Sequence, residues 1–228
     1  MSLLRISWFG LAAHIAVAAP VMAQPQPVQQ PPLMDRQKEI ALALSACPSS
    51  VAANAAVYVL ARDGYVKVRD SQNGFTAIVQ HALPTSQEPQ CLDAEGTRTH
   101  LPRLLKIAEL RAQGKSREEI NRFVADAFAK GIFQAPTRPG VDYMLSTQNI
   151  VAVDEEKGTI VPFPPHVMFY GPYLTNADLG SDGSPNGPVF VVNQGSPHAL
   201  IIVPIGAHAE TRRSAAGKAG SRESAKSR

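Results

Sequence analysis

The chain has 228 residues, of which 44% are hydrophobic and 18% charged, and its formal net charge is +3. About 170 residues, from 34 to 205, suit one domain that is long enough to bury a hydrophobic core. The positive charge lies outside this stretch, because residues 24–207 carry a net charge of −2, which argues against a nucleic-acid-binding domain.

The N-terminus has the pattern of a cleavable secretory signal. Arg5 precedes an apolar run over 6–19, which is shorter than the roughly 20 apolar residues of a membrane-spanning helix. Pro20 breaks the run, and Val21-Met22-Ala23 then places a small aliphatic residue and an alanine where signal peptidase requires small side chains. We expect residues 1–23 to be removed after Ala23, which makes the mature protein periplasmic or secreted. An uncleaved membrane anchor is the alternative.

Both ends of the mature chain are predicted to lie outside the folded domain. Residues 24–33 form a Pro/Gln-rich linker that favours an extended conformation. Residues 207–228 carry a net charge of +4 and no large apolar side chain, and they predict a disordered basic tail. Such a tail is able to contact anionic envelope surfaces. Residues 34–206 remain as a single domain.

A short helix is predicted to begin the domain. Asp35 is a suitable N-cap, and Ile40, Leu44 and Cys47 fall on one stripe before Pro48 ends the helix.

The chain contains two cysteines, Cys47 and Cys91. Exported proteins tend to pair their thiols. A Cys47–Cys91 bond would close a loop of about 45 residues and contribute roughly 3–4 kcal/mol. Two separate buried thiols are the alternative, because a free cysteine also packs as a small apolar residue.

Residues 56–79 contain three β-rich segments, 56–60, 65–69 and 75–79, and a short fourth follows at 91–93. Turn signals separate them, Arg62-Asp63-Gly64 between the first two and Asn73-Gly74 before the third. These signals predict an N-terminal β-meander in which consecutive strands pair.

Two helices are then expected to form an αα-hairpin. Pro102 suits a first helical turn, and Gly114 is a natural stop. Ser116 and Glu119 form a capping box for the second helix, which Gly131 ends. Apolar residues recur at helical spacing in both helices: Leu101, Leu104, Leu105 and Ala108, then Ile120, Val124, Ala127 and Phe128.

The rest of the domain is read as short strands, at 141–145, 150–153, 159–163, 167–170, 189–192 and 200–203. Strands therefore cluster on either side of a helical pair, instead of alternating with single helices. This pattern predicts the α+β class. The mostly antiparallel sheet combines the N-terminal meander with the C-terminal strands and packs with the αα-hairpin and the short N-terminal helix.

The segment 162–178 is the strongest candidate for a site, since prolines stiffen it and aromatic residues alternate with polar ones. Candidate ligand-binding residues are Phe163, His166, Tyr170, Tyr173 and Asn176. His166 and Asp178 are candidate catalytic residues, His166 as a base or a metal ligand and Asp178 as the group that orients it or as a co-ligand. The alternative is a structural role, with the aromatic residues in the core, a capped His166 and an Asx-turn at 176–178.

A second cluster contains Cys91, Asp93, Glu95 and His100, but its spacing matches no closed metal motif. We therefore assign no metal ligands, and the sequence identifies no cofactor. His81 and His198 stand alone beside loop prolines and are interpreted as surface residues.

Parts of the chain resemble a group of exported bacterial proteins without an assigned activity. The resemblance is carried by GYVKVR at 64–69, NGFT at 73–76 and the segment from PFPPH at 162–166 to residue 178. It implies export and a single domain over most of 36–203, but no reaction and no catalytic residue. Members of the group often carry a cysteine at the position of Ala77, so the resemblance leaves the partner of Cys91 open.

The sequence thus favours an exported binding or accessory module. A small hydrolase or metal-assisted enzyme that uses His166 and Asp178 is one alternative. An envelope-associated structural protein held by its basic tail is another.

Overall fold

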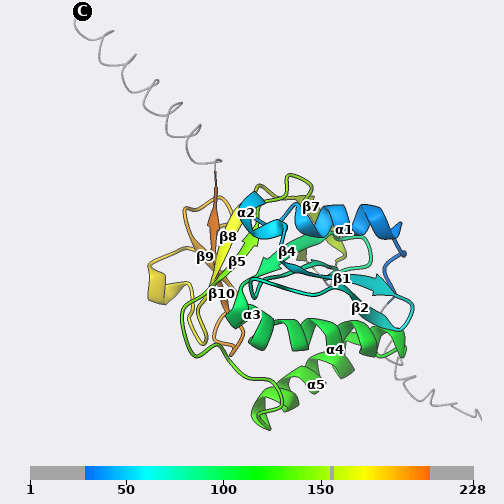
Figure 1. Ribbon diagram of the computed structural model, residues 1–228. Helices are drawn as coiled ribbons and strands as arrows, with labels where there is room; N and C mark the ends of the chain where they lie inside the picture. The colour runs from blue at the N-terminus through cyan, green and yellow to red at the C-terminus, as the bar shows by residue number, and fades with distance from the viewer. Residues whose placement is uncertain (1–28, 155–156, 206–228) are drawn as a thin grey trace, which may run out of the picture.

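Figure 1 shows the computed structural model of the protein, which describes residues 29–154 and 157–205. The predicted signal, the first part of the predicted linker and the predicted tail lie outside the described residues.

An eight-stranded sheet forms the centre of the fold, with the strand order β2-β1-β3-β4-β5-β8-β10-β9. Its strands are β1 (Ala56–Ala61), β2 (Gly64–Arg69), β3 (Thr76–Gln80), β4 (Glu88–Leu92), β5 (Val141–Met144), β8 (His166–Tyr170), β9 (Phe190–Val192) and β10 (Leu200–Pro204). A separate two-stranded sheet pairs β6 (Ile150–Asp154) with β7 (Thr159–Pro162). Neighbouring strands are antiparallel except for β1 and β3, which confirms the predicted α+β class with a mostly antiparallel sheet.

The predicted meander is wrong in one connection, because β3 pairs with β1 in parallel and does not pair with β2. The loop 70–75 crosses the start of β1 instead of closing a hairpin. Its backbone N–H at Gln72 donates to Asn54 O at 2.8 Å, and Asn73 Nδ2 donates to Val51 O at 2.9 Å. Gly74 supplies the positive φ of 81° that the sequence predicts, but within this crossover.

Helix α1 (Arg36–Leu44) covers one face of the sheet, followed by the short α2 (Ser49–Ala52) (Figure 1). Asp35 caps α1 as predicted, since its Oδ1 accepts from Lys38 N at 3.1 Å. The buried Glu39 carboxylate accepts from Leu60 N at 2.7 Å and so fastens α1 to β1.

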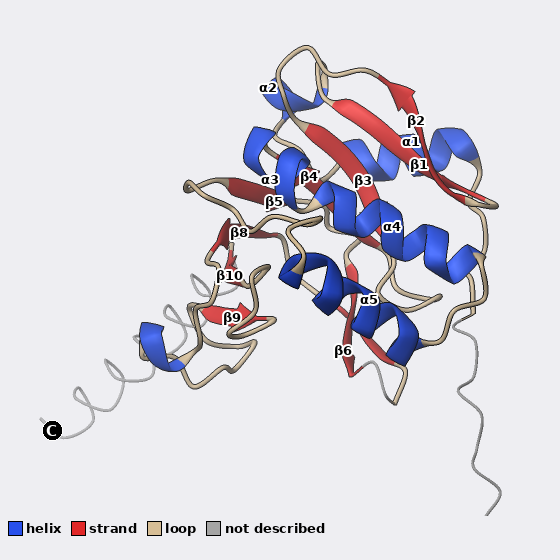
Figure 2. Ribbon diagram, turned by 90° about the horizontal axis from the view of Figure 1, so that it is seen from below, coloured by secondary structure: helices blue, strands red, loops and turns tan. Residues whose placement is uncertain are grey.

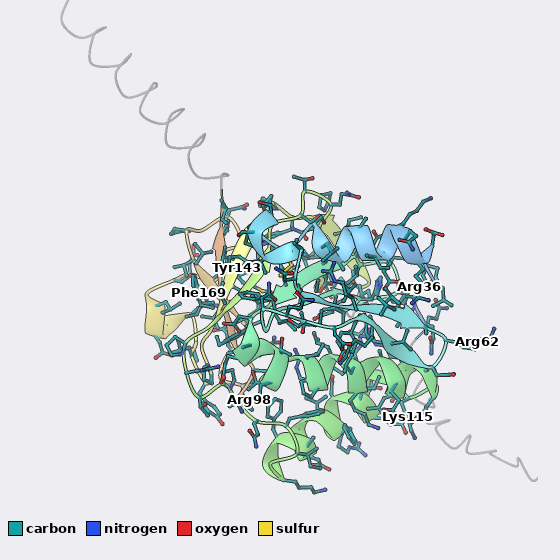
Figure 3. All side chains as sticks on the ribbon, in the orientation of Figure 1. Arg36, Arg62, Arg98, Lys115, Tyr143 and Phe169 are labelled. Atoms are coloured by element: carbon teal, nitrogen blue, oxygen red, sulfur yellow. A yellow bond between two sulfur atoms is a disulfide. The ribbon has the colours of Figure 1, made fainter. Side chains whose placement is uncertain are left out.

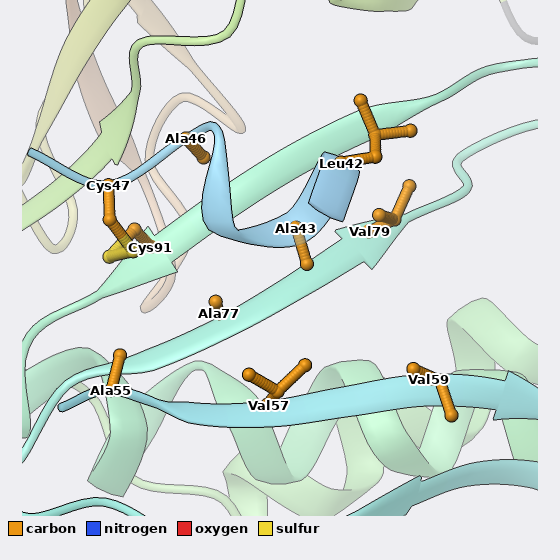
Figure 4. Close-up of a cluster of buried hydrophobic side chains, with 10 residues drawn as sticks. All are labelled: Leu42, Ala43, Ala46, Cys47, Ala55, Val57, Val59, Ala77, Val79 and Cys91. Atoms are coloured by element: carbon orange, nitrogen blue, oxygen red, sulfur yellow. A yellow bond between two sulfur atoms is a disulfide. The ribbon is translucent and has the colours of Figure 1, made fainter. Parts of the chain in front are cut away.

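The core under α1 is a cluster of small and β-branched side chains (Figure 4). Its buried members are Leu42, Ala43, Ala46, Cys47, Ala55, Val57, Val59, Ala77, Val79 and Cys91. A disulfide joins Cys47 to Cys91 at the edge of this cluster. Opposite Cys91 in the β3–β4 register lies Ala77, a fully buried residue without a thiol. The disulfide therefore does not join these two strands but connects β4 to the segment after α1.

The opposite face carries α3 (Ala94–Thr99), α4 (Leu101–Ala112) and α5 (Arg117–Ala129). The predicted αα-hairpin is confirmed, including both hydrogen bonds of its capping box: Glu119 N donates to Ser116 Oγ at 3.2 Å, and Ser116 N donates to Glu119 Oε2 at 2.8 Å. Helix α4 lies against the sheet, and α5 lies against α4, farther from β1 to β4 (Figure 2).

A layer of larger side chains joins α4 to the sheet, with Leu101 and Leu104 packed on Ile78 of β3 and Leu92 of β4. Helix α3 is not predicted by the sequence, because its residues AEGTRT have no apolar period. No helix within the described ranges is long and apolar enough to cross a membrane.

We expect reduction of the Cys47–Cys91 bond to destabilise the protein, because the open chain gains conformational entropy in the unfolded state. The expected loss is about 3–4 kcal/mol, or about 10 °C in the melting temperature of a domain of this size. Thermal unfolding followed by circular dichroism, with and without reductant, measures the difference.

The control is the double variant Cys47→Ala/Cys91→Ala, whose melting temperature should be insensitive to reductant. An unchanged melting temperature of the wild-type protein, with two thiols titrated after reduction, would contradict the prediction.

Candidate functional site

The predicted pair His166 and Asp178 is not brought together. His166 is the first residue of β8 and is buried, with Nδ1 2.9 Å from Pro164 O and its ring edge-on to Phe163 at 4.9 Å. Burial lowers the pKa of His166. Asp178 follows the other end of β8, in the 3₁₀ helix η1 (Ala177–Leu179), and its Oδ2 accepts from Thr175 N and Oγ1 at 2.8 Å each. The structure gives both side chains local structural partners.

The other candidates of the segment 162–178 are also distributed. Phe163 packs edge-on to Phe190, and Asn176 Oδ1 accepts from Val191 N at 2.7 Å, which holds the loop before η1 to β9. Tyr173 has a φ of 66° and is 63% exposed, and its N–H donates to Ser196 O at 2.8 Å.

Tyr170 instead joins the second predicted cluster. Its hydroxyl lies 3.0 Å from Asp93 Oδ1 and 3.1 Å from Val141 O, and its ring stacks on His100 at 4.8 Å. Burial raises the pKa of Tyr170, with the carboxyls of Asp142 and Asp93 acting in the same direction. The phenol is therefore a neutral structural group that links β8 to the start of α3.

Asp93 and Glu95 have structural partners as well. Asp93 caps α3, since Oδ1 accepts from Gly96 N at 2.8 Å and Oδ2 from Val141 N at 2.9 Å. Cys91 is in the disulfide. Within residues 29–154 and 157–205, no group of three or more His, Cys, Asp or Glu side chains is placed to hold a metal ion.

Glu95 fastens the connection between α5 and β5. Its carboxylate accepts from Arg98 Nη2 at 2.6 Å, Arg138 Nε at 3.2 Å and Thr137 N at 2.7 Å. Arg98, in the last turn of α3, lies on the face of the sheet that carries the αα-hairpin (Figure 3). Burial alone would raise the pKa of Glu95, but the hydrogen bonds from these three donors outweigh it and lower the pKa to about 2.

A cavity of about 610 Å³ lies between the αα-hairpin, the sheet and the loop 193–198. The side chains of its apolar wall come mainly from the two helices: Leu60, Leu104, Ile107, Ala108, Ile120, Val124 and Phe128. Gln30 and Pro31, at the end of the predicted linker, also line it, and Pro31 is buried. The described end of the linker therefore packs against the domain before α1 begins.

One polar side of the cavity is built around His81. The interpretation of His81 as a surface residue is wrong, because its side chain is buried and its Nδ1 lies 2.5 Å from Ser86 O. Arg111 binds the carbonyls of His81 and Ala82 through its two Nη atoms. Burial lowers the pKa of His81.

The other polar side contains Arg103 and His198. The Nε of Arg103, in the first turns of α4, is buried and has no hydrogen-bond partner among the described residues. Burial lowers the pKa of Arg103 to about 10. His198 is half-buried, not on the surface as predicted, and its ring stacks on Phe128 at 5.3 Å. Its Nδ1 is likewise buried with no partner in the described chain.

His100 lies behind this pair at the start of α4, with a buried Nε2 that no described residue contacts through a hydrogen bond. Burial and the nearby Arg103 lower the pKa values of His100 and His198 to about 3 each. Both imidazoles are therefore neutral at physiological pH, while Arg103 is charged.

One feature of the sequence points to this site, in addition to those described above. Arg103, Ile107 and Arg111 follow each other at i, i+4 and i+8, so two arginines share a helix face with an apolar residue. The partner His198 has no such signal, because it lies in a loop far along the chain.

Comparisons with known proteins assign no family to this arrangement. The scan against family models and the searches of curated proteins and of solved structures found no match.

We expect Glu95→Gln to lower the free energy of unfolding at pH 7 by about 2 kcal/mol, because charge-assisted hydrogen bonds become neutral ones. The pKa of Glu95 in the folded protein, about 2, lies below its ordinary value near 4.3. The stabilisation is therefore complete above about pH 4.3 and is lost as the pH falls toward 2.

Urea unfolding at pH 7 and at pH 3 measures the effect, and the gap between wild type and Glu95→Gln should narrow at pH 3. Asp126→Asn, an exposed change on α5, is the control and should stay within about 0.5 kcal/mol of wild type. Equal urea midpoints for wild type and Glu95→Gln at pH 7 would refute the role given to this carboxylate.

Proposed function

We propose that the protein is an exported carrier that binds a small, largely apolar molecule in the cavity under the αα-hairpin. The observation that carries this proposal is the cavity itself, with a volume of about 610 Å³ and a wall of leucine, isoleucine, valine and phenylalanine. Ligand pockets measure roughly 300–1,000 Å³ and combine an apolar wall with a few polar groups.

The packing around the cavity supports a ligand. The cavity is partly open to solvent, and its apolar wall is more stable when an apolar molecule covers it than when water does. The αα-hairpin is closely packed away from the cavity, through Leu110, Ala127 and Phe133, and Leu101 packs on Ile78 and Leu92 of the sheet. A ligand in the remaining space would restore the contacts that these helices lack with the sheet and the loop 193–198.

The mouth of the cavity is identified by residues that line it and are also exposed. Asn121, Ala125 and Ala129 present this combination on α5, and Tyr173 does so from the opposite loop. The small side chains of the two alanines leave room for a ligand to enter between α5 and that loop.

Export is supported by the leader pattern of residues 1–23 and by the Cys47–Cys91 disulfide, a bond that persists mainly in oxidising compartments. The alternative of a hydrolase receives no support from His166 and Asp178, which have separate structural partners. The alternative of an envelope-bound structural protein rests on a tail outside the described residues.

We expect the neutral fluorescent probe N-phenyl-naphthylamine to bind the mature protein, with a rise in emission as it leaves water. Ala125→Trp should abolish this binding, because the indole would block the mouth of the cavity. Fluorescence titration measures both affinities.

Ala112→Trp provides the matched control, because it makes the same substitution on the same hairpin at a residue that does not line the cavity. It should bind the probe as the wild type does. Undiminished binding by a folded Ala125→Trp variant would rule out this cavity as the site.

A further inference from the structure

We propose that the ligand is an anion, an apolar molecule with one carboxylate, phosphate or sulfonate group, and that this group binds between Arg103 and His198. This inference rests on the proposed function and adds the chemical class of the ligand. The first observation behind it is that the buried Nε of Arg103 has no hydrogen-bond partner among the described residues.

Arg103 lines the cavity and is half-buried, and its Nε is buried with no hydrogen-bond partner among the described residues. A buried donor of a charged group that lacks a partner is destabilising. Its position adds to the penalty, because Arg103 lies in the first turn of α4, where the helix dipole disfavours a cation. A bound anion would supply a partner for the Arg103 side chain and would also offset the unfavourable interaction of its positive charge with the helix dipole.

The rest of the cavity lining contains no counter-ion for Arg103. None of the described lining residues is an aspartate or a glutamate. The carboxylate of Glu95, which influences the neighbouring His100, is already bound by Arg98, Arg138 and Thr137 N. The Nε of Arg103 therefore has no acidic partner on the described cavity wall, and an anion from outside the protein can supply one.

His198 provides a second group suited to an acidic oxygen. A neutral imidazole carries one N–H donor, and the Nδ1 of His198 lies buried without a partner in the described chain. A guanidinium beside an imidazole can donate to two oxygens of one carboxylate, phosphate or sulfonate. The ring of Phe128, stacked on His198, continues this polar end into the apolar wall.

The arrangement of the wall indicates how the ligand lies. Arg103 and Ile107 lie one turn apart on α4, so the apolar wall that includes Ile107, Ile120 and Val124 begins next to the charged group. An acid with an aliphatic or aromatic body fits both regions at once, whereas a small inorganic anion would leave the apolar wall unfilled.

Two probes that differ by one sulfonate test this inference: neutral N-phenyl-naphthylamine and anilinonaphthalene sulfonate. The wild type should bind the sulfonated probe about tenfold more tightly or better, since a charge-assisted pair contributes at least 1.4 kcal/mol. Arg103→Met should remove this preference and leave the affinity for the neutral probe within about twofold. Fluorescence titration on the folded, disulfide-bonded mature protein gives both constants.

Arg122→Met is the matched control, because Arg122 is an exposed arginine of α5 outside the cavity. It should leave both affinities unchanged, which excludes attraction of the sulfonate to the general surface. Arg103→Lys retains the charge and should recover part of the preference, even where Arg103→Met lowers stability.

The outcomes separate this inference from the proposed function. Equal wild-type affinity for the two probes, or an equal loss of both in a folded Arg103→Met variant, overturns the anion assignment and leaves the carrier intact. Failure of the wild type to bind either probe overturns both.

Discussion

The burial of β3 on both faces is the constraint on which the rest of the structure depends. Ala77 and Val79 point to α1, and Ile78 between them points to α4, so successive side chains of one strand hold the two helical layers. The side toward α1 is filled with small side chains and closed by the Cys47–Cys91 disulfide. The side toward α4 carries larger residues, and there the packing is interrupted by the cavity.

The cavity results from the way in which the two helices of the αα-hairpin are stacked on the sheet. Helix α4 contacts the sheet through Leu101 and Leu104, while α5 packs on α4 and reaches past the strands toward the loop 193–198. Two helices stacked in this way cannot both touch the sheet. The space beside α4 is enclosed by α5 and the loop, and it remains the natural place for a ligand.

The hydrogen bonds made by the buried charged groups of the domain also support a ligand in this cavity. Glu95 is surrounded by three donors, Asp93 by three, and Glu39 accepts from a strand N–H. Buried acidic groups are thus bound wherever they occur in structural roles. Arg103 differs from these acidic groups, because its Nε is buried with no partner among the described residues, and it lines the cavity, where an external anion can supply that partner.

The sequence by itself determined the local elements: the Asp35 cap, the Ser116–Glu119 capping box, the stripes of the αα-hairpin and the strands that follow it. These depend on neighbours within a few residues, which the sequence displays directly. Only the tertiary structure decided that β3 lies parallel to β1, that Tyr170 meets Asp93 and that Arg103 faces the same cavity as His198. Such contacts join residues far apart in the chain, and they follow from how the layers pack, which no short sequence pattern records.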